Sequence, residues 1–481
     1  MKRLLASAIA ILTGIGVTSE AAGKKNPPIA GLSGVETQAA IFVMLDKDMR
    51  AKDTVYTWNS NKRLTPASLT KLFTTAAILD SKGSRYRIRT RIGYEPETGI
   101  VVLHGAYDPT TDSRFFDKGQ LEAVADTLAE KLKAKKATKG LRLTTDKSLE
   151  TQTPYCPKHM WYDMGNYYGV SPSDLMADDN MTTLYFSSPK GIDRPCKIDS
   201  MNPDDGWKTR PISYVRSYEG KSDQCFIYMA GDTWYADGQI PSNRPVFEVR
   251  SSIPYPTEHY GKKMARLLRE RGIDIEYASN PTLEEAAKHD RTLMNVESPE
   301  IWEVIRETNL WSINHYAEAM LMHLASIDRR EKIRRGERDE RKLTWEEGVD
   351  YLKNYWKERA GIDIKIADGS GLSPKGSFSA GDVVKLLEYM GRTKEREFWI
   401  NSLPVAGMTG TMSDIGERSV VAGKVWAKTG SMSGVMAVGG YMECKSGRMA
   451  AFCLITNHDE EPMSIIRKAI GDWLVRMYKK N

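Results

Sequence analysis

The sequence has few cysteines and histidines, and neither set forms a metal-binding pattern. The five cysteines show none of the paired spacings of a zinc site, and at least one of them must stay unpaired within the chain because five is an odd number. The seven histidines include no His-Glu-x-x-His string. The sequence therefore predicts neither a catalytic metal nor a cofactor.

A strong charge of one sign is also missing, as are internal repeats and low-complexity tracts. The formal net charge is +6 and is scattered, with no arginine-rich arm, so the sequence predicts no nucleic-acid partner, although an anionic cell-envelope surface would suit it. The chain has 481 residues, 41% of them hydrophobic and 27% charged. This composition indicates a globular protein with a large core and about three domains.

Long hydrophobic runs are absent except at the N-terminus. There a basic start precedes an apolar run over Leu4–Val17, and Ser19 and Ala21 form a plausible cleavage pair. This pattern predicts a signal peptide over residues 1–21 and export to the periplasm or cell envelope. A retained membrane anchor is the alternative, but the run is short for a spanning helix.

The Gly-x-Ser-x-Gly string of classical esterases does not occur, but a Ser-x-x-Lys pattern does, at Ser68 and Lys71 in "PASLTKLF". A serine hydroxyl is a poor nucleophile unless a base removes its proton, and at helical spacing Lys71 lies close enough to do so. A second copy, residues 187–190, contains an interior proline that argues against the helix needed to align the pair.

The helix expected around this motif starts at residues 65 and 66. Thr65 is a reasonable N-cap and Pro66 fits the first helical position, which would place Ser68 in the first turn, where free N–H groups could hold an oxyanion. Lysine is protonated at neutral pH unless burial and a second cation lower its pKa. A second cation is therefore expected elsewhere in the chain.

Lys428-Thr429-Gly430, on an expected strand, is the candidate for that cation. Lys428 could supply the charge, Thr429 a hydroxyl for a substrate carboxylate, and Gly430 a bare backbone along which a substrate can lie. A rival Lys-Ser-Gly string at residues 445–447 occupies the turn of an expected hairpin, and turn chemistry explains it.

Ser312-Ile313-Asn314, at the expected start of a helix, could bring a hydroxyl and an amide to the same cleft. Its rival, residues 200–202, is followed by a proline in a loop-like stretch. Each motif alone is weak, but the ordered set is specific: Ser-x-x-Lys on a helix, Ser-x-Asn at a helix start, and Lys-Thr-Gly on a strand.

This ordered set resembles the penicillin-recognising serine enzymes. Within them, the chain resembles the class C low-molecular-mass penicillin-binding proteins, which are D-alanyl-D-alanine carboxypeptidases and endopeptidases of the penicillin-binding protein 4 type. The long separation between the first two motifs is typical of that family, whereas a compact β-lactamase has a much shorter one. The stretches "HGAYDPTTD", "DGSGLSPKGSFSA" and "AKTGSMSGVMAVGGYM" agree with the resemblance.

The resemblance implies an α/β (α+β) fold of the β-lactamase/transpeptidase-like class, with a five-stranded antiparallel sheet flanked by helices. The catalytic domain would be discontinuous, over residues 30–91 and 290–481. Residues 92–289 would form a large inserted region, with an α/β lobe over about 92–150 and a β-rich lobe over about 151–289.

Site roles also follow from the resemblance. It implies five catalytic residues, namely Ser68 as the acylated nucleophile, Lys71 as general base, Ser312 and Lys428 as proton carriers to the leaving D-alanine, and Asn314 as an orienting amide. It implies three substrate-binding residues, namely Thr429 for the terminal carboxylate, Gly430 beside the peptide, and Ser431, whose N–H joins that of Ser68 in an oxyanion hole.

The implied activity is that of a serine-type D-alanyl-D-alanine carboxypeptidase, with endopeptidase action as a further option, on peptidoglycan stem peptides. β-Lactams would act as covalent inhibitors. Two alternatives stay open, a β-lactamase or esterase on the same fold and a non-catalytic cell-wall binding protein. The sequence carries no prediction of the oligomeric state.

Several conspicuous residues have simpler interpretations. The "DGSGLSP" stretch could build a turn near the cleft or face the substrate, and the two histidines of the expected 312–325 helix are expected to be packed or on the surface. Four aromatic residues could form a sugar-stacking surface, but the core of the β-rich lobe is the favoured location; they are Trp161, Tyr162, Tyr167 and Tyr168.

Overall fold

The structure is a computed structural model that describes residues 26–30, 35–231, 233–280, 283, 289–337, 342–458 and 461–481. The expected signal peptide, residues 1–21, lies outside the described residues.

The strongest apolar runs of the sequence pair into one five-stranded sheet. In spatial order its strands are β17 (Val425–Met432), β18 (Val435–Glu443), β19 (Met449–Asn457), β1 (Gln38–Leu45) and β2 (Ala51–Trp58). All four neighbouring pairs are antiparallel, and β1 joins the N-terminal part of the chain to the C-terminal part through β19. The predicted five-stranded antiparallel sheet is confirmed.

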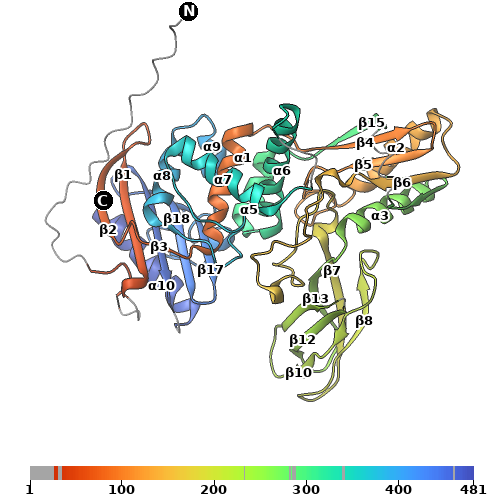
Figure 1. Cartoon of the computed structure of the whole chain (residues 1–481). Helices are drawn as coiled ribbons and strands as arrows, with labels where there is room; N and C mark the ends of the chain where they lie inside the picture. The colour runs from red at the N-terminus through yellow and green to blue at the C-terminus, as the bar shows by residue number, and fades with distance from the viewer. Residues whose placement is uncertain are drawn as a thin grey trace, which may run out of the picture.

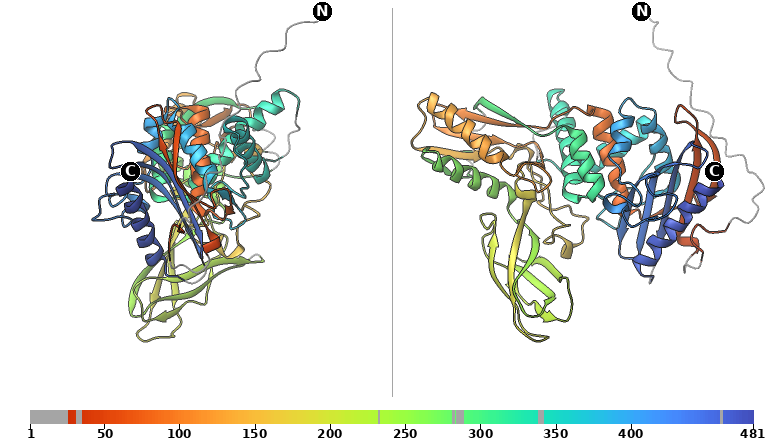
Figure 2. Two further views of the ribbon diagram at one scale, coloured as in Figure 1. Left: turned by 90° about the vertical axis from the view of Figure 1, so that its left-hand side faces the viewer. Right: turned by 180° about the vertical axis from the view of Figure 1, so that it is seen from behind.

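Helices cover both faces of this sheet, because its central strands are apolar on both sides. In β1, Val43 packs into the core on one face and its neighbour Phe42 into the core on the other. Figure 2 shows α10 (Met463–Lys480) against the second face. The helices on the first side are α1 (Lys71–Lys82), α5 (Ile301–Trp311), α6 (Asn314–Arg334), α7 (Trp345–Ala360), α8 (Ala380–Gly391) and α9 (Arg396–Asn401).

Helix α1 is the innermost of these helices. Every residue from Lys71 to Leu79 is buried, as expected for a helix with partners on all sides. It begins at Lys71 and not at Pro66, so the expected cap at Thr65 is wrong. The side-chain amide of Asn457 binds both the N–H and the carbonyl of Thr65 at 3.0 Å, which ties this residue to β19 ahead of the helix.

The inserted region contains a mixed α/β sheet. In order its strands are β14 (Ile275–Tyr277), β6 (Leu141–Thr145), β5 (Ile100–His104), β4 (Arg89–Glu95) and β15 (Arg291–Glu297). Helices α2 (Gln120–Ala134) and α3 (Pro256–Glu270) share one apolar core with it. The expected division of the insertion near residue 150 differs from this arrangement, because the chain returns to the α/β sheet after the β-rich part.

The β-rich part is built from two small sheets around the core of Leu184, Phe186 and Trp234. One sheet contains β13 (Arg244–Ser252), β7 (Met181–Ser188) and β8 (Lys197–Asn202), and the other β9 (Ile212–Ser213), β10 (Arg216–Tyr218), β11 (Gln224–Ala230) and β12 (Thr233–Pro241). Figure 1 shows both inserted lobes on the far side of the helices from the large sheet.

The core location expected for the aromatic stretch in this part is wrong for three of the four residues. Trp161 is 55% exposed, Tyr162 41% and Tyr167 50%, because they lie on a short 3₁₀ turn and a loop at the lobe surface, outside the strands.

Candidate active site

The Ser-x-x-Lys motif lies where a 3₁₀ turn, residues Ala67–Thr70, leads into α1. Ala67 has a φ of +48°, so the chain enters the turn through a left-handed residue. Ser68 is half-buried, whereas the Lys71 side chain is completely buried. The hydroxyl therefore reaches the surface of the site while the amine lies beneath it.

The amine of Lys71 has three oxygen neighbours. Its Nζ lies 2.8 Å from the Ser68 hydroxyl, 2.5 Å from Asn314 Oδ1 and 2.8 Å from the Ser370 carbonyl oxygen. A neutral amine has two N–H groups and one lone pair. The Asn314 amide and the Ser370 carbonyl can only accept from Nζ here, so the lone pair of a neutral Lys71 is left for the proton of Ser68.

Burial prepares Lys71 for that role. Loss of contact with water lowers its pKa from 10.5 to about 7, against the opposing effect of the carboxylates of Asp368 and Glu318. At neutral pH a large fraction of the amine is thus uncharged. This lowered pKa is the property that the sequence required of a catalytic lysine.

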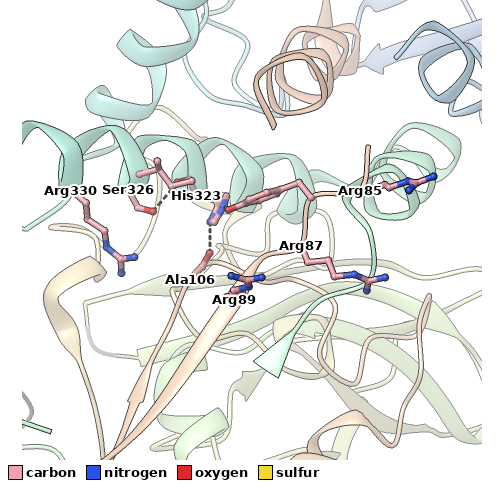
Figure 3. A pocket seen from close by; sticks show the side chains of 9 residues that line it. Arg85, Arg87, Arg89, Ala106, His323, Ser326 and Arg330 are labelled. Carbon is pink, nitrogen blue, oxygen red and sulfur yellow. Dashed lines mark hydrogen bonds between the residues drawn. The ribbon is translucent and has the colours of Figure 1, made fainter. Parts of the chain in front are cut away.

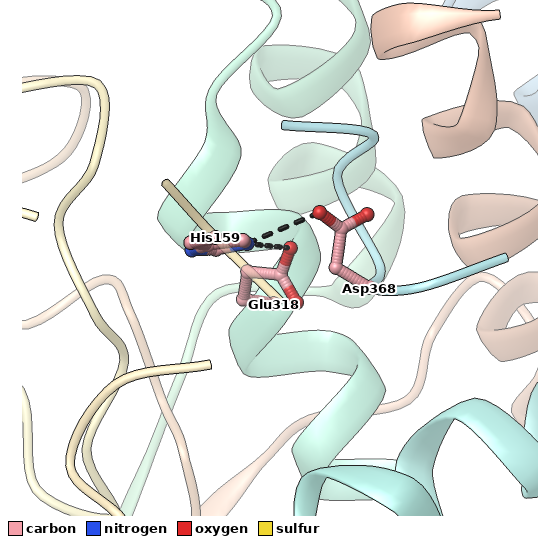
Figure 4. A group of neighbouring side chains, drawn as sticks. All are labelled: His159, Glu318 and Asp368. Atoms are coloured by element: carbon pink, nitrogen blue, oxygen red, sulfur yellow. Dashed lines mark hydrogen bonds and ion pairs between the residues drawn. The ribbon is translucent and has the colours of Figure 1, made fainter. Parts of the chain in front are cut away.

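His159, Glu318 and Asp368 form a buried cluster (Figure 4), and the charges of its two carboxylates act on Lys71. His159 Nε2 is 3.1 Å from the Asp368 carboxylate and 3.9 Å from that of Glu318. The two carboxylates accept four backbone N–H groups of the 369–373 loop at 2.7–3.0 Å. The cluster therefore fixes the loop that presents the Ser370 carbonyl to Lys71.

The charges in this cluster compensate one another. Burial alone would lower the pKa of His159, but the hydrogen bond and charge of Asp368 raise it well above its ordinary value. Burial in turn raises the pKa of Asp368, yet the bond to His159 brings it below 3.8. Burial and the Asp368 charge raise the pKa of Glu318 to about 6. These three side-chain types also ligate metals, but an imidazolium here supplies the positive charge, and the carboxylate oxygens already accept backbone N–H groups.

The second hydroxyl–amine pair is Ser312 and Lys428. Ser312 ends α5 with a φ of +60°, and α6 begins two residues later at Asn314, close to the predicted helix start. Lys428 Nζ lies 2.9 Å from Ser312 Oγ and 2.7 Å from the Thr429 carbonyl. Burial, together with the charges of Lys71 and Arg467, lowers the pKa of Lys428 well below its ordinary value.

Strand β17 lies directly against the nucleophile turn. A Cβ at Gly430 would be 2.2 Å from the Pro66 carbonyl oxygen, so only glycine permits this approach. The Thr429 hydroxyl bonds that of Thr411 at 2.7 Å, and Ser431 is exposed. The free edge of this strand beside Ser68 suits an extended peptide.

Six of the predicted site residues form two hydrogen-bonded groups, and Gly430 and Ser431 continue the strand of the second group. The first group is Ser68, Lys71 and Asn314, and the second is Ser312, Lys428 and Thr429; the charge of Lys71 acts on Lys428 of the second group. The rival motifs lie elsewhere, residues 187–190 and 200–202 in or beside strands of the β-rich lobe and residues 445–447 in the turn between β18 and β19. Spatial proximity therefore separates the candidate motifs from their rivals.

Sequence reasoning missed several supporting residues. The Tyr168 carbonyl accepts a bond of 2.8 Å from the Asn314 side chain, and the Thr411 carbonyl binds Arg467 at 2.6 Å. His159 and Glu318 were also missed. Of these, only Glu318 had a local signal, since it follows Asn314 by one helical turn.

Two cavities can be compared with this arrangement. One of about 380 Å³ is lined by Ser312 and Asn314 together with Tyr168, Arg114 and Arg250 of the inserted region. A larger one of about 450 Å³ lies under α6, where arginines gather around His323, and contains none of the predicted site residues (Figure 3). The smaller cavity is therefore the one that adjoins the predicted catalytic residues.

Known proteins share this sequence pattern and fold. The sequence profile of the D-Ala-D-Ala carboxypeptidase 3 (S13) family matches residues 35–477. A D-alanyl-D-alanine carboxypeptidase of Actinomadura sp. (strain R39) is 24% identical over 456 residues, 88% of this chain and 79% of that protein. Penicillin-sensitive carboxypeptidase A of Dictyostelium discoideum is 23% identical over 411 residues, 80% of this chain and 75% of that protein.

The crystal structure of penicillin binding protein 4 from Haemophilus influenzae has the same fold. Its TM-score is 0.72 at 18% sequence identity, and the match covers 92% of this chain and 97% of that one. The family match over nearly the whole chain favours a carboxypeptidase over the alternatives of a β-lactamase, an esterase or a non-catalytic binding protein. The chain belongs to the D-Ala-D-Ala carboxypeptidase 3 (S13) family and is a serine-type D-Ala-D-Ala carboxypeptidase.

Proposed function

We propose that Ser68 is the nucleophile and Lys71 the general base of this carboxypeptidase. The observation that carries the proposal is the bonding of Lys71, whose two other acceptors leave one lone pair for the Ser68 proton at 2.8 Å. A pKa near 7 supports the same role, because the amine can take up a proton at neutral pH.

Two proton transfers accompany acylation. Ser68 Oγ bonds to the carbonyl carbon of the penultimate D-alanine while its proton passes to Lys71, and the oxyanion is held by the N–H groups of Ser68 and Ser431. The peptide bond breaks as the proton held by Lys71 is passed through Ser312 and Lys428 to the nitrogen of the terminal D-alanine, which leaves Lys71 neutral again. A water molecule then gives a proton to Lys71 as it attacks the ester carbonyl, and that proton returns to Ser68 Oγ when the ester bond breaks.

Thr429 and the surrounding cations suit the terminal carboxylate of the substrate. Thr429 is buried and bonds Thr411, two residues before the exposed Ser431 on β17, and the charge of Arg467 acts on the neighbouring Lys428. The upstream residues of the stem peptide would occupy the cavity beside Asn314. Arg114 and Arg250 in its wall favour carboxylate groups there.

Inhibition by β-lactams is part of the proposal, since a β-lactam can acylate the same hydroxyl. A second crystal structure of the Haemophilus influenzae protein is a complex with a β-lactam. The test is covalent labelling by a fluorescent penicillin. Ser68→Ala should abolish the label, whereas Ser187→Ala, in the rival Ser-x-x-Lys string, should keep it. A label that persists in Ser68→Ala would remove the assignment.

The natural substrate is proposed to be the stem peptide of peptidoglycan, with endopeptidase cleavage of cross-links as a second action. Incubation with intact, cross-linked peptidoglycan and mass spectrometry of the fragments separates the two actions. Free D-alanine indicates carboxypeptidase action, and uncross-linked stem peptides indicate endopeptidase action. Ser68→Ala is the control for both products.

Export to the periplasm or cell envelope, after removal of residues 1–21, is proposed from the sequence pattern. In the part of the chain that the structure describes, no helix combines the length and apolar character needed to cross a membrane. Determination of the N-terminus of the mature protein from a cell-envelope fraction tests this proposal. An intact Met1 would contradict it.

The division into domains is likewise a proposal. Residues 30–91 and 290–481 would form the catalytic domain and 92–289 the insertion, which is supported by the separate cores of the large sheet and the α/β sheet. Because α3, β14 and β15 pack on that α/β sheet, we place them in the α/β lobe, which extends the insertion from residue 289 to Glu297. Limited proteolysis, with cleavage expected between the cores, is the test.

A further inference from the structure

The outer face of the sheet containing β11 and β12 carries aromatic side chains that the proposed reaction does not use. Side chains alternate along β11, so Ile227 is completely buried while Phe226 and Tyr228 lie on the opposite face. Tyr235 of β12 stands directly across from Tyr228 and extends the same face. A strand that is apolar on both faces but covered on only one indicates a binding surface.

The rings on this face form a continuous series. Tyr228 stacks on Tyr235 with centroids 5.7 Å apart, and Tyr235 stacks on Tyr214 at 6.0 Å. The short 3₁₀ turn Trp161–Asp163 adds two more rings, one against Tyr228 at 5.0 Å and one against Phe226 at 6.4 Å. We call this set the aromatic platform; its members are Trp161, Tyr162, Tyr214, Phe226, Tyr228 and Tyr235.

The platform is open over much of its area. Tyr214 is 59% exposed and Trp161 55%, and Phe226 is also exposed. Neighbouring strands are about 4.8 Å apart, so a platform crossing three strands is about 10 Å wide before the turn is added. The platform is therefore an open surface on which several small rings of a ligand could stack side by side.

One loop connects the platform to the active-site cavity. Tyr162 belongs to the same tight loop as Tyr167 and Tyr168, because the Asn166 side chain donates to the Tyr162 carbonyl at 2.7 Å. Tyr167 and Tyr168 line the cavity beside Ser312, and the Tyr168 carbonyl accepts from Asn314. The platform therefore lies at the other end of the loop that lines the cavity.

We propose that the aromatic platform binds the glycan strand of peptidoglycan, the sugar polymer to which the stem peptide is joined. This inference rests on the proposed function, since it places the peptide of the same molecule in the adjacent cavity. Tyr and Trp rings combine an apolar face with a polar edge, and a pyranose ring offers a face of C–H groups rimmed by hydroxyls. The aromatic rings of the platform can therefore stack on sugar rings without a charged side chain.

The test measures binding of peptide-free glycan strands, prepared by amidase digestion of peptidoglycan, to the full chain by calorimetry. The double variant Trp161→Ala/Tyr228→Ala should raise the dissociation constant about tenfold or more. Tyr255→Ala removes an exposed aromatic ring outside the platform and should leave the constant unchanged. Penicillin labelling at the parent rate shows that the double variant is folded.

Substrate length separates this inference from the proposed function. The double variant should release D-alanine from a soluble pentapeptide at the parent rate but more slowly from polymeric peptidoglycan. Glycan binding that is absent in the parent protein, or equal in parent and double variant, would overturn the platform assignment. A parent protein that released no D-alanine from any substrate would instead overturn the proposed function, and the calorimetry would still decide the platform.

Discussion

The rate of acylation should follow the protonation of Lys71. With a pKa of about 7, the amine is neutral in about 1% of molecules at pH 5, about half at pH 7 and about 99% at pH 9. A lysine with its ordinary pKa would be neutral in only about one molecule in 2,500 at pH 7. Burial therefore raises the reactive fraction at neutral pH about a thousandfold.

The expected profile follows directly. The second-order rate constant for a fluorescent penicillin should rise about tenfold per pH unit below pH 6, bend near pH 7 and level off above pH 8. Stopped-flow measurements from pH 5 to 9 give this curve, and Ser68→Ala gives its blank. A rate that is flat over this range, or that still rises tenfold per unit above pH 9, would refute the assignment.

Two variants identify the titrating amine, because Lys428 is also buried. The Asp368 carboxylate favours the charged form of Lys71, so Asp368→Asn should move the bend below pH 7. Arg467 lowers the pKa of Lys428, so Arg467→Gln should leave the bend in place. A bend that moves with Arg467→Gln and not with Asp368→Asn would identify Lys428 as the base.

Three further substitutions test the surroundings of the site. Gly430→Ala brings a Cβ within 2.2 Å of a backbone oxygen and should slow penicillin acylation more than tenfold, while Gly376→Ala, whose nearest atom is at 3.7 Å, should keep the parent rate. Thr429→Val removes a hydroxyl proposed to bind a carboxylate, so D-alanine release should lose about tenfold to a hundredfold in kcat/KM, mainly through KM; an unchanged KM would contradict that role. His159→Gln removes the cation between two buried carboxylates and should destabilise the fold by roughly 3 kcal/mol in chemical denaturation at pH 7, whereas an unchanged unfolding midpoint would show that the carboxylates need no cation.

Local features of the site could be predicted from the sequence because they depend on near neighbours. The spacing of Ser68 and Lys71 brings their side chains together whether the intervening residues form an α-helix or the observed 3₁₀ turn. Lys428 and Thr429 lie on the expected strand, which begins with the apolar residues Val425, Trp426 and Ala427. Ser312 lies at a helix boundary as expected.

The exact start of α1 and the placement of the aromatic loop were not predictable in this way. Thr65 has the composition of a helix cap, but its backbone is bound by Asn457, 392 residues away. The aromatic residues near 161 have the composition of a core, yet they lie on a turn that packs over the outer side of a sheet. In both cases a long-range contact decides against the local preference.

The sequence by itself determined which groups can react, because a hydroxyl three residues from an amine and a Lys-Thr-Gly strand are properties of short segments. Only the tertiary structure decided that Lys71 can be a base. Its low pKa comes from burial, and its lone pair is directed by Asn314 and Ser370, which are 243 and 299 residues away along the chain. Desolvation and distant acceptors arise only when the whole chain packs, so no local pattern encodes them.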